Sequence, residues 1–235
     1  MSFPSFFAVL FAGDPLRSGA PARRLAALAF LLAGLLGCAF AQAAVYTFNG
    51  LPVDSCTLQG NLYTCPYPAY LEATDSVVIG SAYTLKVTNN VTVTYNQGLT
   101  MAAGAKLIVT GNLNIKGINP ANLKVTGGGS IEVGGHFSMG DLRQTLSADI
   151  SAASMHLGTD AITINGNLNS KGAIAIGSYA RINGNVSATV VTTGSPVSIS
   201  GNVTATQSLS LASGSTVGGD VDTGSLVLES SEALI

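Results

Sequence analysis

The side chains of this sequence that are best suited to catalysis are carboxylates. Their spacing does not predict a catalytic pair. Glycoside hydrolysis requires two carboxyl groups that face one bond. Asp220 and Asp222 are two residues apart, so both would lie on one face of a strand, but Asn202 and Asn185 stand at the matching places in the preceding repeats. We therefore interpret the pair as a solvated corner and keep a polysaccharide-cleaving enzyme as an alternative. The remaining acidic residues considered are scattered: Glu132, Asp141, Asp149, Asp160 and Glu229.

The two histidines, His136 and His156, do not indicate a hydrolytic site or a metal site. A nucleophilic serine would be favoured by a Gly-x-Ser-x-Gly elbow, which the sequence lacks. A structural zinc ion is bound by four ligands. The two histidines are distant in sequence from each other and from the cysteines, so the sequence does not indicate a zinc site. The calcium-binding nonapeptide pattern is approached only once, at residues 218–222, without its third glycine. We predict no catalytic, cofactor-binding or metal-binding residue, and therefore no cofactor.

A short apolar-x-Gly-Asn/Asp-apolar phrase recurs in the second half of the chain at 17–18-residue spacing. Such a fixed period is typical of a solenoid in which each repeat is one coil. Residues 106–115 introduce the phrase and residues 133–137 are a looser copy. The sequence distance from the glycine of each of these two copies to the next repeat glycine is longer than 17–18 residues. We therefore expect insertions in these coils, with loops at 127–129 and 141–144. The structural repeat residues are Gly166, Asn167, Gly184, Asn185, Gly201, Asn202, Gly219 and Asp220.

Eighteen residues suffice for three sides of about six residues, each a short strand and a corner. Strand alternation should point Leu168, Val186, Val203 and Val221 inward as one aliphatic stack. Glycine suits a corner because it tolerates positive φ, and asparagines about 4.8 Å apart on successive coils would form a ladder. We therefore predict an all-β fold, a right-handed parallel β-helix of about nine coils over residues 77–235. The sequence stops part-way through a coil, so we expect either a truncated chain or a last coil that stacks on another copy.

The first 43 residues are typical of a signal peptide. Three arginines between residues 17 and 24 precede an uncharged apolar stretch at 25–40, and Ala41-Gln42-Ala43 has the small-x-small pattern of a cleavage site. We therefore predict an exported protein located in the periplasm, on the outer-membrane surface or outside the cell, with Ala44 as the first mature residue. A lipid anchor at Cys38 is the alternative.

Residues 44–76 differ from the repeats and contain Cys56 and Cys65. Eight residues separate the two cysteines, and in an exported chain this spacing indicates a disulfide, with two free thiols as the alternative. A hairpin around Gln59-Gly60-Asn61 is expected between residues 58 and 65. Because an open solenoid end would expose both the core and a strand edge, we interpret this segment as a disulfide-bonded N-terminal cap. Its aromatic residues offer the alternative of a binding patch.

Composition and charge exclude several classes of protein. With 47% hydrophobic and only 9% charged residues, the chain is not typical of disorder. Three of the ten basic residues and one of the twelve acidic residues lie before Ala44, so the mature chain carries seven positive and eleven negative groups, a net charge of −4. It has no basic stripe, and we predict no nucleic-acid partner. The apolar run at 25–40 is short for a membrane span, and we predict no transmembrane span in the mature chain.

Two bacterial families share features of this sequence. Ile-x-Gly-Asn-Val at 17–18-residue spacing, over about residues 162–228, resembles the bactofilin-type polymer-forming β-helix. The export signal, Tyr63-Thr64-Cys65, residues 84–87 and the Gly-Asn steps together resemble the N-terminal region of MSHA-pilus-biogenesis MshQ-like proteins over most of the mature chain. The first resemblance implies a filament, although bactofilins are cytoplasmic and this chain has an export signal. The second implies an exported protein tied to pili or the cell surface, and its greater length implies truncation here.

We predict a non-enzymatic exported structural module that presents a weakly charged Ser/Thr/Asn face at the cell surface, with a role in pilus biogenesis or adhesion. Its partners would be pilus or cell-envelope proteins, or further copies of the chain through end-to-end self-association. Two alternatives stay open. One is a β-helix enzyme that binds or cleaves polysaccharide, and the other is a self-polymerising β-helix scaffold.

Overall fold

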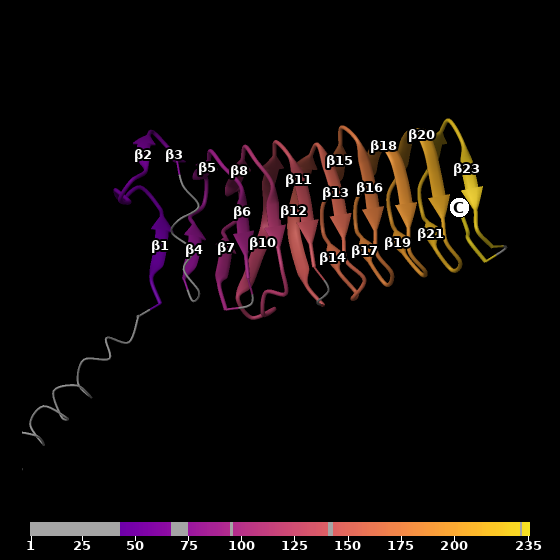
Figure 1. Ribbon diagram of the computed structural model, residues 1–235, viewed down its shortest axis with the longest axis horizontal. Helices are drawn as coiled ribbons and strands as arrows, with labels where there is room; N and C mark the ends of the chain where they lie inside the picture. The colour runs from indigo at the N-terminus through magenta and orange to yellow at the C-terminus, as the bar shows by residue number, and fades with distance from the viewer. Residues whose placement is uncertain (1–42, 67–74, 95, 141–142, 231) are drawn as a thin grey trace, which may run out of the picture. The chain divides into compact units, whose positions relative to one another are not determined.

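A computed structural model describes residues 43–66, 75–94, 96–140, 143–230 and 232–235, and these residues contain strands and turns but no helix. Residues 42–235 form one compact unit. Apart from Ala43, the predicted signal peptide, with Cys38, lies outside the described residues. Strands of successive coils lie side by side along the unit (Figure 1), and among the described strands only the β2–β3 pairing is antiparallel. The predicted all-β parallel solenoid is confirmed.

The strands align in three rows, and each row forms one side of the coil. Face 1 contains β1 (Val45–Phe48), β4 (Ser76–Ile79), β7 (Gly98–Met101), β14 (Thr163–Ile164), β17 (Arg181–Ile182), β19 (Ser198–Ile199) and β21 (Thr216–Val217). Face 2 contains β3 (Leu62–Cys65), β5 (Thr84–Val87), β8 (Lys106–Val109), β15 (Leu168–Ser170) and β22 (Val221–Thr223). Face 3 contains β6 (Val91–Val93), β9 (Leu113–Ile115), β11 (His136–Met139), β13 (Ser154–Leu157), β16 (Ala173–Ile176) and β23 (Leu226–Leu228).

Four longer strands turn a corner and belong to two faces each. β10 (Leu123–Val133) and β12 (Thr145–Ala152) run from face 1 to face 2, because their first residues pair with face 1 strands and their last residues with face 2 strands. β18 (Val186–Thr193) and β20 (Val203–Leu211) run from face 2 to face 3 in the same way.

The core consists of aliphatic columns along the axis of the stack. Alternate residues of each strand point inward, and the parallel register places equivalent residues of successive coils on top of one another. On face 1, Ile164, Ile182 and Ile199 are in register and at most 1% exposed. Burial of each such side chain stabilises the fold by roughly 1.5–3 kcal/mol. The predicted stack on face 2 is also present: Leu168, Val186, Val203 and Val221.

Coil length differs between the two halves of the stack. The residues that follow one another in register along face 2 are widely spaced in the early coils and closely spaced in the later ones: Tyr63, Leu85, Leu107 and Ile131, then Ile150, Leu168, Val186, Val203 and Val221. From Leu85 onward this row crosses eight coils. The expectation of about nine coils after residue 77 is therefore slightly too high, because the early coils are longer than the repeat.

The expected insertion between Gly135 and Gly166 is wrong. The Gly135 carbonyl accepts a hydrogen bond from the backbone N–H of Ala153, 2.9 Å away. The coil from Gly135 to Ala153 therefore has the length of the later repeats. Gly135 lies at the corner between faces 2 and 3, and Gly166 lies at the corner between faces 1 and 2. The long step from Gly135 to Gly166 therefore joins different corners, because the same turn chemistry serves both.

The glycine loop expected at 127–129 lies inside strand β10. Gly127 and Gly128 have φ of 89° and 77°, and the register with β12 shifts between Val125 and Gly129, as in a β-bulge. Of the second expected loop, residues 141 and 142 lie outside the described residues. Gln144 is 3% exposed, and its side-chain N–H donates to the Ile118 carbonyl at 2.7 Å.

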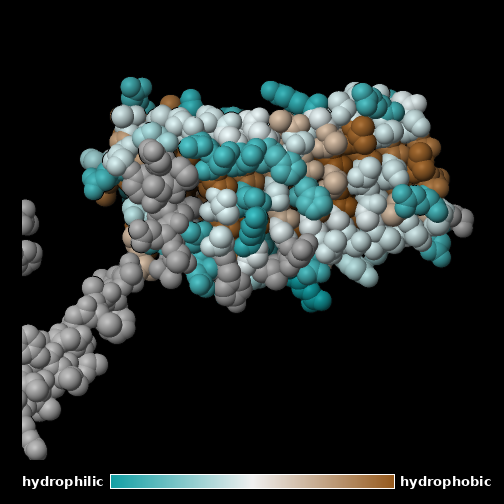
Figure 2. Space-filling model, in the orientation of Figure 1, coloured by the Kyte–Doolittle hydropathy of each residue, from teal (hydrophilic) through white to brown (hydrophobic). Residues whose placement is uncertain are grey.

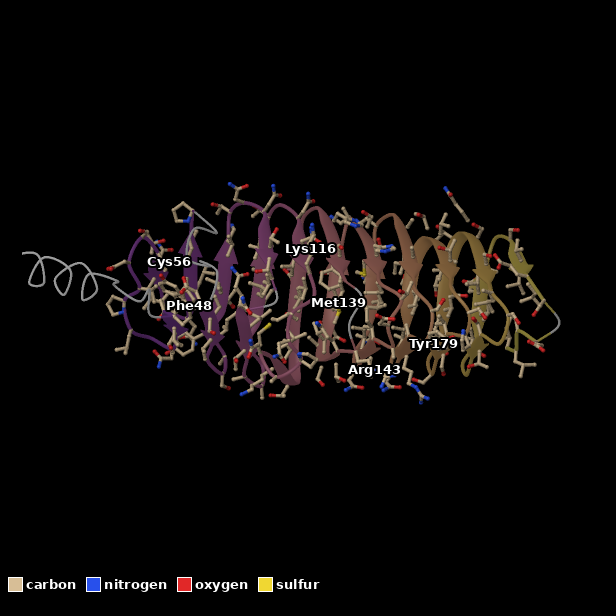
Figure 3. All side chains as sticks on the ribbon, turned by 60° about the horizontal axis from the view of Figure 1, so that its bottom comes forward. Phe48, Cys56, Lys116, Met139, Arg143 and Tyr179 are labelled. Carbon is tan, nitrogen blue, oxygen red and sulfur yellow. A yellow bond between two sulfur atoms is a disulfide. The ribbon has the colours of Figure 1, made fainter. Side chains whose placement is uncertain are left out.

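A compact hairpin closes the first coil. β2 (Thr57–Gln59) pairs antiparallel with β3, the turn contains Gly60 with φ of 58°, and Cys56 and Cys65 form a disulfide. Tyr63 is fully buried beside Phe48, with ring centroids 5.0 Å apart. The Tyr63 hydroxyl donates to the Leu51 carbonyl at 2.7 Å and accepts the Gly50 N–H at 2.8 Å. The predicted hairpin and disulfide are confirmed, and Phe48 and Cys56 lie at the same end of the stack (Figure 3).

Candidate functional site

The Gly-Asn phrases form a continuous ladder at the corner between faces 1 and 2. Each side-chain Oδ1 accepts the backbone N–H of the equivalent residue in the next coil, at 2.7, 2.9, 2.8 and 3.0 Å in order. The ladder members are Asp149, Asn167, Asn185, Asn202 and Asp220. These hydrogen bonds connect neighbouring coils, so the ladder stabilises the stacking of each coil on the one before it.

The glycines beside this ladder are required by close packing rather than by positive φ. A Cβ on Gly184 would overlap the carbonyl group of Gly166, and a Cβ on Gly201 would overlap that of Gly184. Gly166 has φ of 159°, which is close to extended backbone, and none of these glycines adopts the left-handed region. The expectation that positive φ explains them is therefore wrong. Backbones approach here too closely for any side chain.

A second, shorter ladder occupies the corner between faces 2 and 3 in the early coils. The Asn90 Oδ1 accepts the Asn112 N–H at 2.8 Å, and the Asn112 Oδ1 accepts the His136 N–H at 2.7 Å. The His136 Nδ1 lies 2.8 Å from the Ser154 Oγ. His136 is thus an exposed structural member of this ladder. Asp149 and the Asn90 ladder were missed by sequence reasoning, although Asp149 stands one full repeat before Asn167.

Apart from Asp75, which is buried, the described acidic residues are spread over the outside of the stack. Asp222 is exposed on β22, and its neighbour in the previous coil is Thr204. Glu132 forms an ion pair with Lys106, and Asp149 and Asp220 belong to the ladder. His156 is exposed on β13. Within the described residues no group of three His, Cys, Asp or Glu side chains is placed to hold a metal ion, and no helix is long and apolar enough to cross a membrane.

The strongest candidate for a functional surface is the last coil, which exposes large aliphatic side chains. Leu226 and Leu228 are in register with Leu209 and Leu211, which are fully buried, yet are themselves 43% and 46% exposed. Figure 2 shows hydrophobic surface over the C-terminal half of the stack as far as this coil. We call this set of exposed residues the terminal aliphatic surface: Leu226, Val227, Leu228, Leu234 and Ile235.

The outer edge of β23 also presents backbone groups. The Ser225 carbonyl accepts the Leu209 N–H at 2.8 Å, and the Glu229 N–H donates to the Leu211 carbonyl at 3.0 Å. Since backbone groups alternate in direction along a strand, those of Leu226 and Leu228 point away from the stack. No strand in the described part of the chain pairs with this edge. Such an edge is a template for pairing with another strand.

Charge is unevenly distributed along the stack. Lys86, Lys106, Lys116, Lys124 and Arg143 lie in the earlier coils, and no Lys or Arg follows Arg181. The last coil carries four carboxylates: Asp220, Asp222, Glu229 and Glu232. Glu229 and Glu232 accept hydrogen bonds from the hydroxyls of Ser210 and Ser213 at 3.1 and 2.7 Å. The coil that carries the terminal aliphatic surface is therefore acidic.

Comparison with known proteins finds one similarity. Residues 145–234 match the family described as Bactofilin, polymer-forming cytoskeletal. The matched part begins with β12 and contains the shorter later coils, the Asp149–Asp220 ladder and β23, and it leaves the hairpin and the longer coils outside. No curated protein and no solved structure matches the chain. The resemblance to MshQ-like proteins is not confirmed by these comparisons.

Proposed function

We propose that this chain is a non-enzymatic β-helical scaffold that associates with other copies of itself through the terminal aliphatic surface. The observation that carries the proposal is the exposure of Leu226 and Leu228, which continue a column that is fully buried one coil earlier. They lie in the part of the chain that is similar to a polymer-forming family. The alternative of a self-polymerising scaffold therefore has more support than a pilus or adhesion module.

Association would repeat the contact that already holds the coils together. Inside the stack, each coil covers the aliphatic side chains and strand edges of the coil before it. In the last coil three neighbouring aliphatic residues, Leu226 to Leu228, are each more than two-fifths exposed. A second copy would remove this surface from water at a gain of roughly 25 cal/mol per Å² and would pair the open edge of β23.

The test is the molar mass of residues 42–235 measured by light scattering over a range of concentrations. Mass should rise with concentration for the wild type and stay at that of one chain for Leu226→Lys/Leu228→Lys, because lysines at an exposed edge oppose strand pairing. Thr192→Lys is the matched control, since Thr192 is exposed on the same face two coils earlier. A wild type that remains monomeric at high concentration would contradict the proposal.

Export is a further part of the proposal. It is supported by the Ala41-Gln42-Ala43 pattern and by the Cys56–Cys65 disulfide, because disulfides persist mainly in oxidising compartments. A role at pili or in adhesion rests on the sequence resemblance alone. Fractionation of cells that express the full chain, with N-terminal sequencing of the product, tests export. Recovery from the cytoplasm with an intact residue 1–43 segment and reduced cysteines would contradict it.

A further inference from the structure

We propose that the outer side of face 1 in the later coils binds a carboxylated polysaccharide strand, with the Tyr179 ring as the platform on which a sugar stacks. Arg143 and Arg181 would bind carboxylates of the same strand. This inference goes beyond the proposed function, because the surface lies on the side of the stack and its ligand does not depend on self-association.

Tyr179 has a backbone conformation that a bulky residue rarely adopts. It lies at the corner between faces 3 and 1 with φ of 63°, and its N–H donates to the Pro196 carbonyl of the next coil at 2.6 Å. The equivalent position also has positive φ in two other coils, 49° at Ala161 and 69° at Gly214. Glycine adopts this conformation without strain, whereas tyrosine does not. This corner therefore favours glycine, and a strained residue at such a place is typical of a functional site.

The Tyr179 side chain is presented to solvent. It is 62% exposed, whereas the other aromatic side chains in the described part of the chain are buried or half-buried. Within the described residues its hydroxyl forms no hydrogen bond and its ring stacks on no other ring. Neither core packing nor hydrogen bonding accounts for a tyrosine here, so the ring is free to stack on a ligand.

Two exposed guanidinium groups accompany the ring. Arg181 follows Tyr179 by two residues, and Arg143 has the same corner position two coils earlier, about 10 Å along the stack, or two strand spacings. Figure 3 shows Arg143 and Tyr179 along one edge of the stack. Neither arginine forms an ion pair with a described residue, although the exposed Asp160 lies one coil from each. Arginine is suited to bind a carboxylate through two parallel N–H···O bonds.

Two rows of polar side chains extend this surface across face 1. The row of Arg181 also contains hydroxyl side chains: Thr145, Thr163, Ser198 and Thr216. In the second row, the Asn183 side-chain N–H donates to the Asn165 Oδ1 at 2.7 Å, and the Asn165 side-chain N–H donates to the Ser147 Oγ at 3.1 Å. These hydrogen bonds hold the amides in place before a ligand arrives, which lowers the entropy cost of binding.

A sugar chain matches these groups better than a nucleic acid or a protein does. Its rings offer apolar C–H faces to an aromatic ring, and its hydroxyls require several fixed polar partners. A nucleic acid would approach a mature chain with a net charge of −4, which opposes binding to phosphates. A protein partner would favour a central group of apolar anchors, whereas Tyr179 is surrounded by hydroxyl, amide and guanidinium groups. The unpaired guanidinium groups select carboxylated sugars over neutral ones.

The test is binding of residues 42–235 to polygalacturonate and to hyaluronate, two carboxylated glycans, by isothermal titration calorimetry. Methyl-esterified polygalacturonate keeps the sugar backbone without its charge and should bind at least about twofold more weakly. Tyr179→Gly should weaken binding of polygalacturonate about tenfold. It should not lower Tm, because glycine suits the positive φ. A lower Tm with unchanged binding would show a purely structural role for Tyr179 and overturn the proposal.

Charge variants test the two arginines. Arg143→Gln and Arg181→Gln should each weaken binding of polygalacturonate about two- to fivefold, as loss of an exposed ion pair does. Asp160→Asn should strengthen it, because a like charge is removed. Lys171→Gln is the matched control, since Lys171 is exposed after the last residue of β15 on face 2, and it should leave binding unchanged.

Four results would overturn the proposal. They are no binding to either carboxylated glycan, equal binding of the esterified and charged forms, equal losses in the lysine and arginine variants, and tighter binding of single-stranded oligothymidylate than of polygalacturonate. The last result would assign the surface to nucleic acid instead.

Discussion

Loss of one side chain from the Asp149–Asp220 ladder should cost a measurable fraction of the folding free energy. In Asn185→Ala the acceptor of the Asn202 N–H, now 2.8 Å away, is removed, while the bond from the Asn185 N–H to the Asn167 Oδ1 is kept. Asn202 is exposed, so water can replace part of the lost bond. We expect a loss of about 0.5–1.5 kcal/mol, which corresponds to a fall in Tm of a few degrees, roughly 2–4 °C per kcal/mol, for a unit of this size.

The matched control is Asn185→Asp, because aspartate is already the acceptor at position 149 and occupies the ladder at position 220. It retains an oxygen at the same place and should lose less than about 0.5 kcal/mol, as ordinary surface substitutions do. Both variants are measured by urea unfolding followed by circular dichroism, with the midpoint and the slope fitted separately. Equal losses in the two variants, or no loss in Asn185→Ala, would refute the view that the ladder oxygens stabilise coil stacking.

Three further predictions concern the cap, the core and the charged end. Reduction of Cys56–Cys65 frees the short loop that the disulfide closes and should destabilise the cap by about 2–3 kcal/mol, seen as earlier proteolysis within residues 44–66. Ile182→Ala, at a fully buried site, should cost about 2–5 kcal/mol in urea unfolding, whereas Arg181→Ala at the adjacent exposed site should stay within about 0.5 kcal/mol. Because each mature copy carries a net charge of −4, self-association brings like charges together. Raising salt from about 0.01 M to about 0.1 M, which shortens the Debye length from about 30 Å to about 10 Å, should therefore raise the molar mass measured by sedimentation equilibrium at a given concentration.

The parallel solenoid and its inward columns could be predicted because two periods coincide in the sequence. The 17–18-residue spacing sets the coil, and alternation within each strand selects Leu168, Val186 and Val203 for the interior. The corner at which each Gly-Asn phrase lies could not be predicted in the same way. A Gly-Asn step is equally suited to both corners, and only the register shows that Gly135 and Gly166 belong to different ones.

The sequence also does not show why the repeat phrase requires glycine. A Gly at a turn fits either positive φ or a close backbone contact, and the pattern alone does not separate the two. Likewise, Leu226, Val227 and Leu228 are as apolar as the residues of an inner strand. Their exposure follows from their position in the last coil of the described stack, which local sequence does not encode. The place of Asp149 in the ladder could have been predicted, because the number of residues from Asp149 to Asn167 equals the number from Asn167 to Asn185.

Hydrogen exchange as a function of concentration tests the central claim most directly. In a single copy the outward amides of Leu226 and Leu228 have no strand partner among the described residues, so they should exchange fast. We predict that mass spectrometry of residues 42–235 finds slower exchange in peptides covering 221–229 as concentration rises, with no change in peptides covering the hairpin at 57–65. Concentration-dependent protection at the hairpin instead, or at neither end, would contradict association through the terminal aliphatic surface.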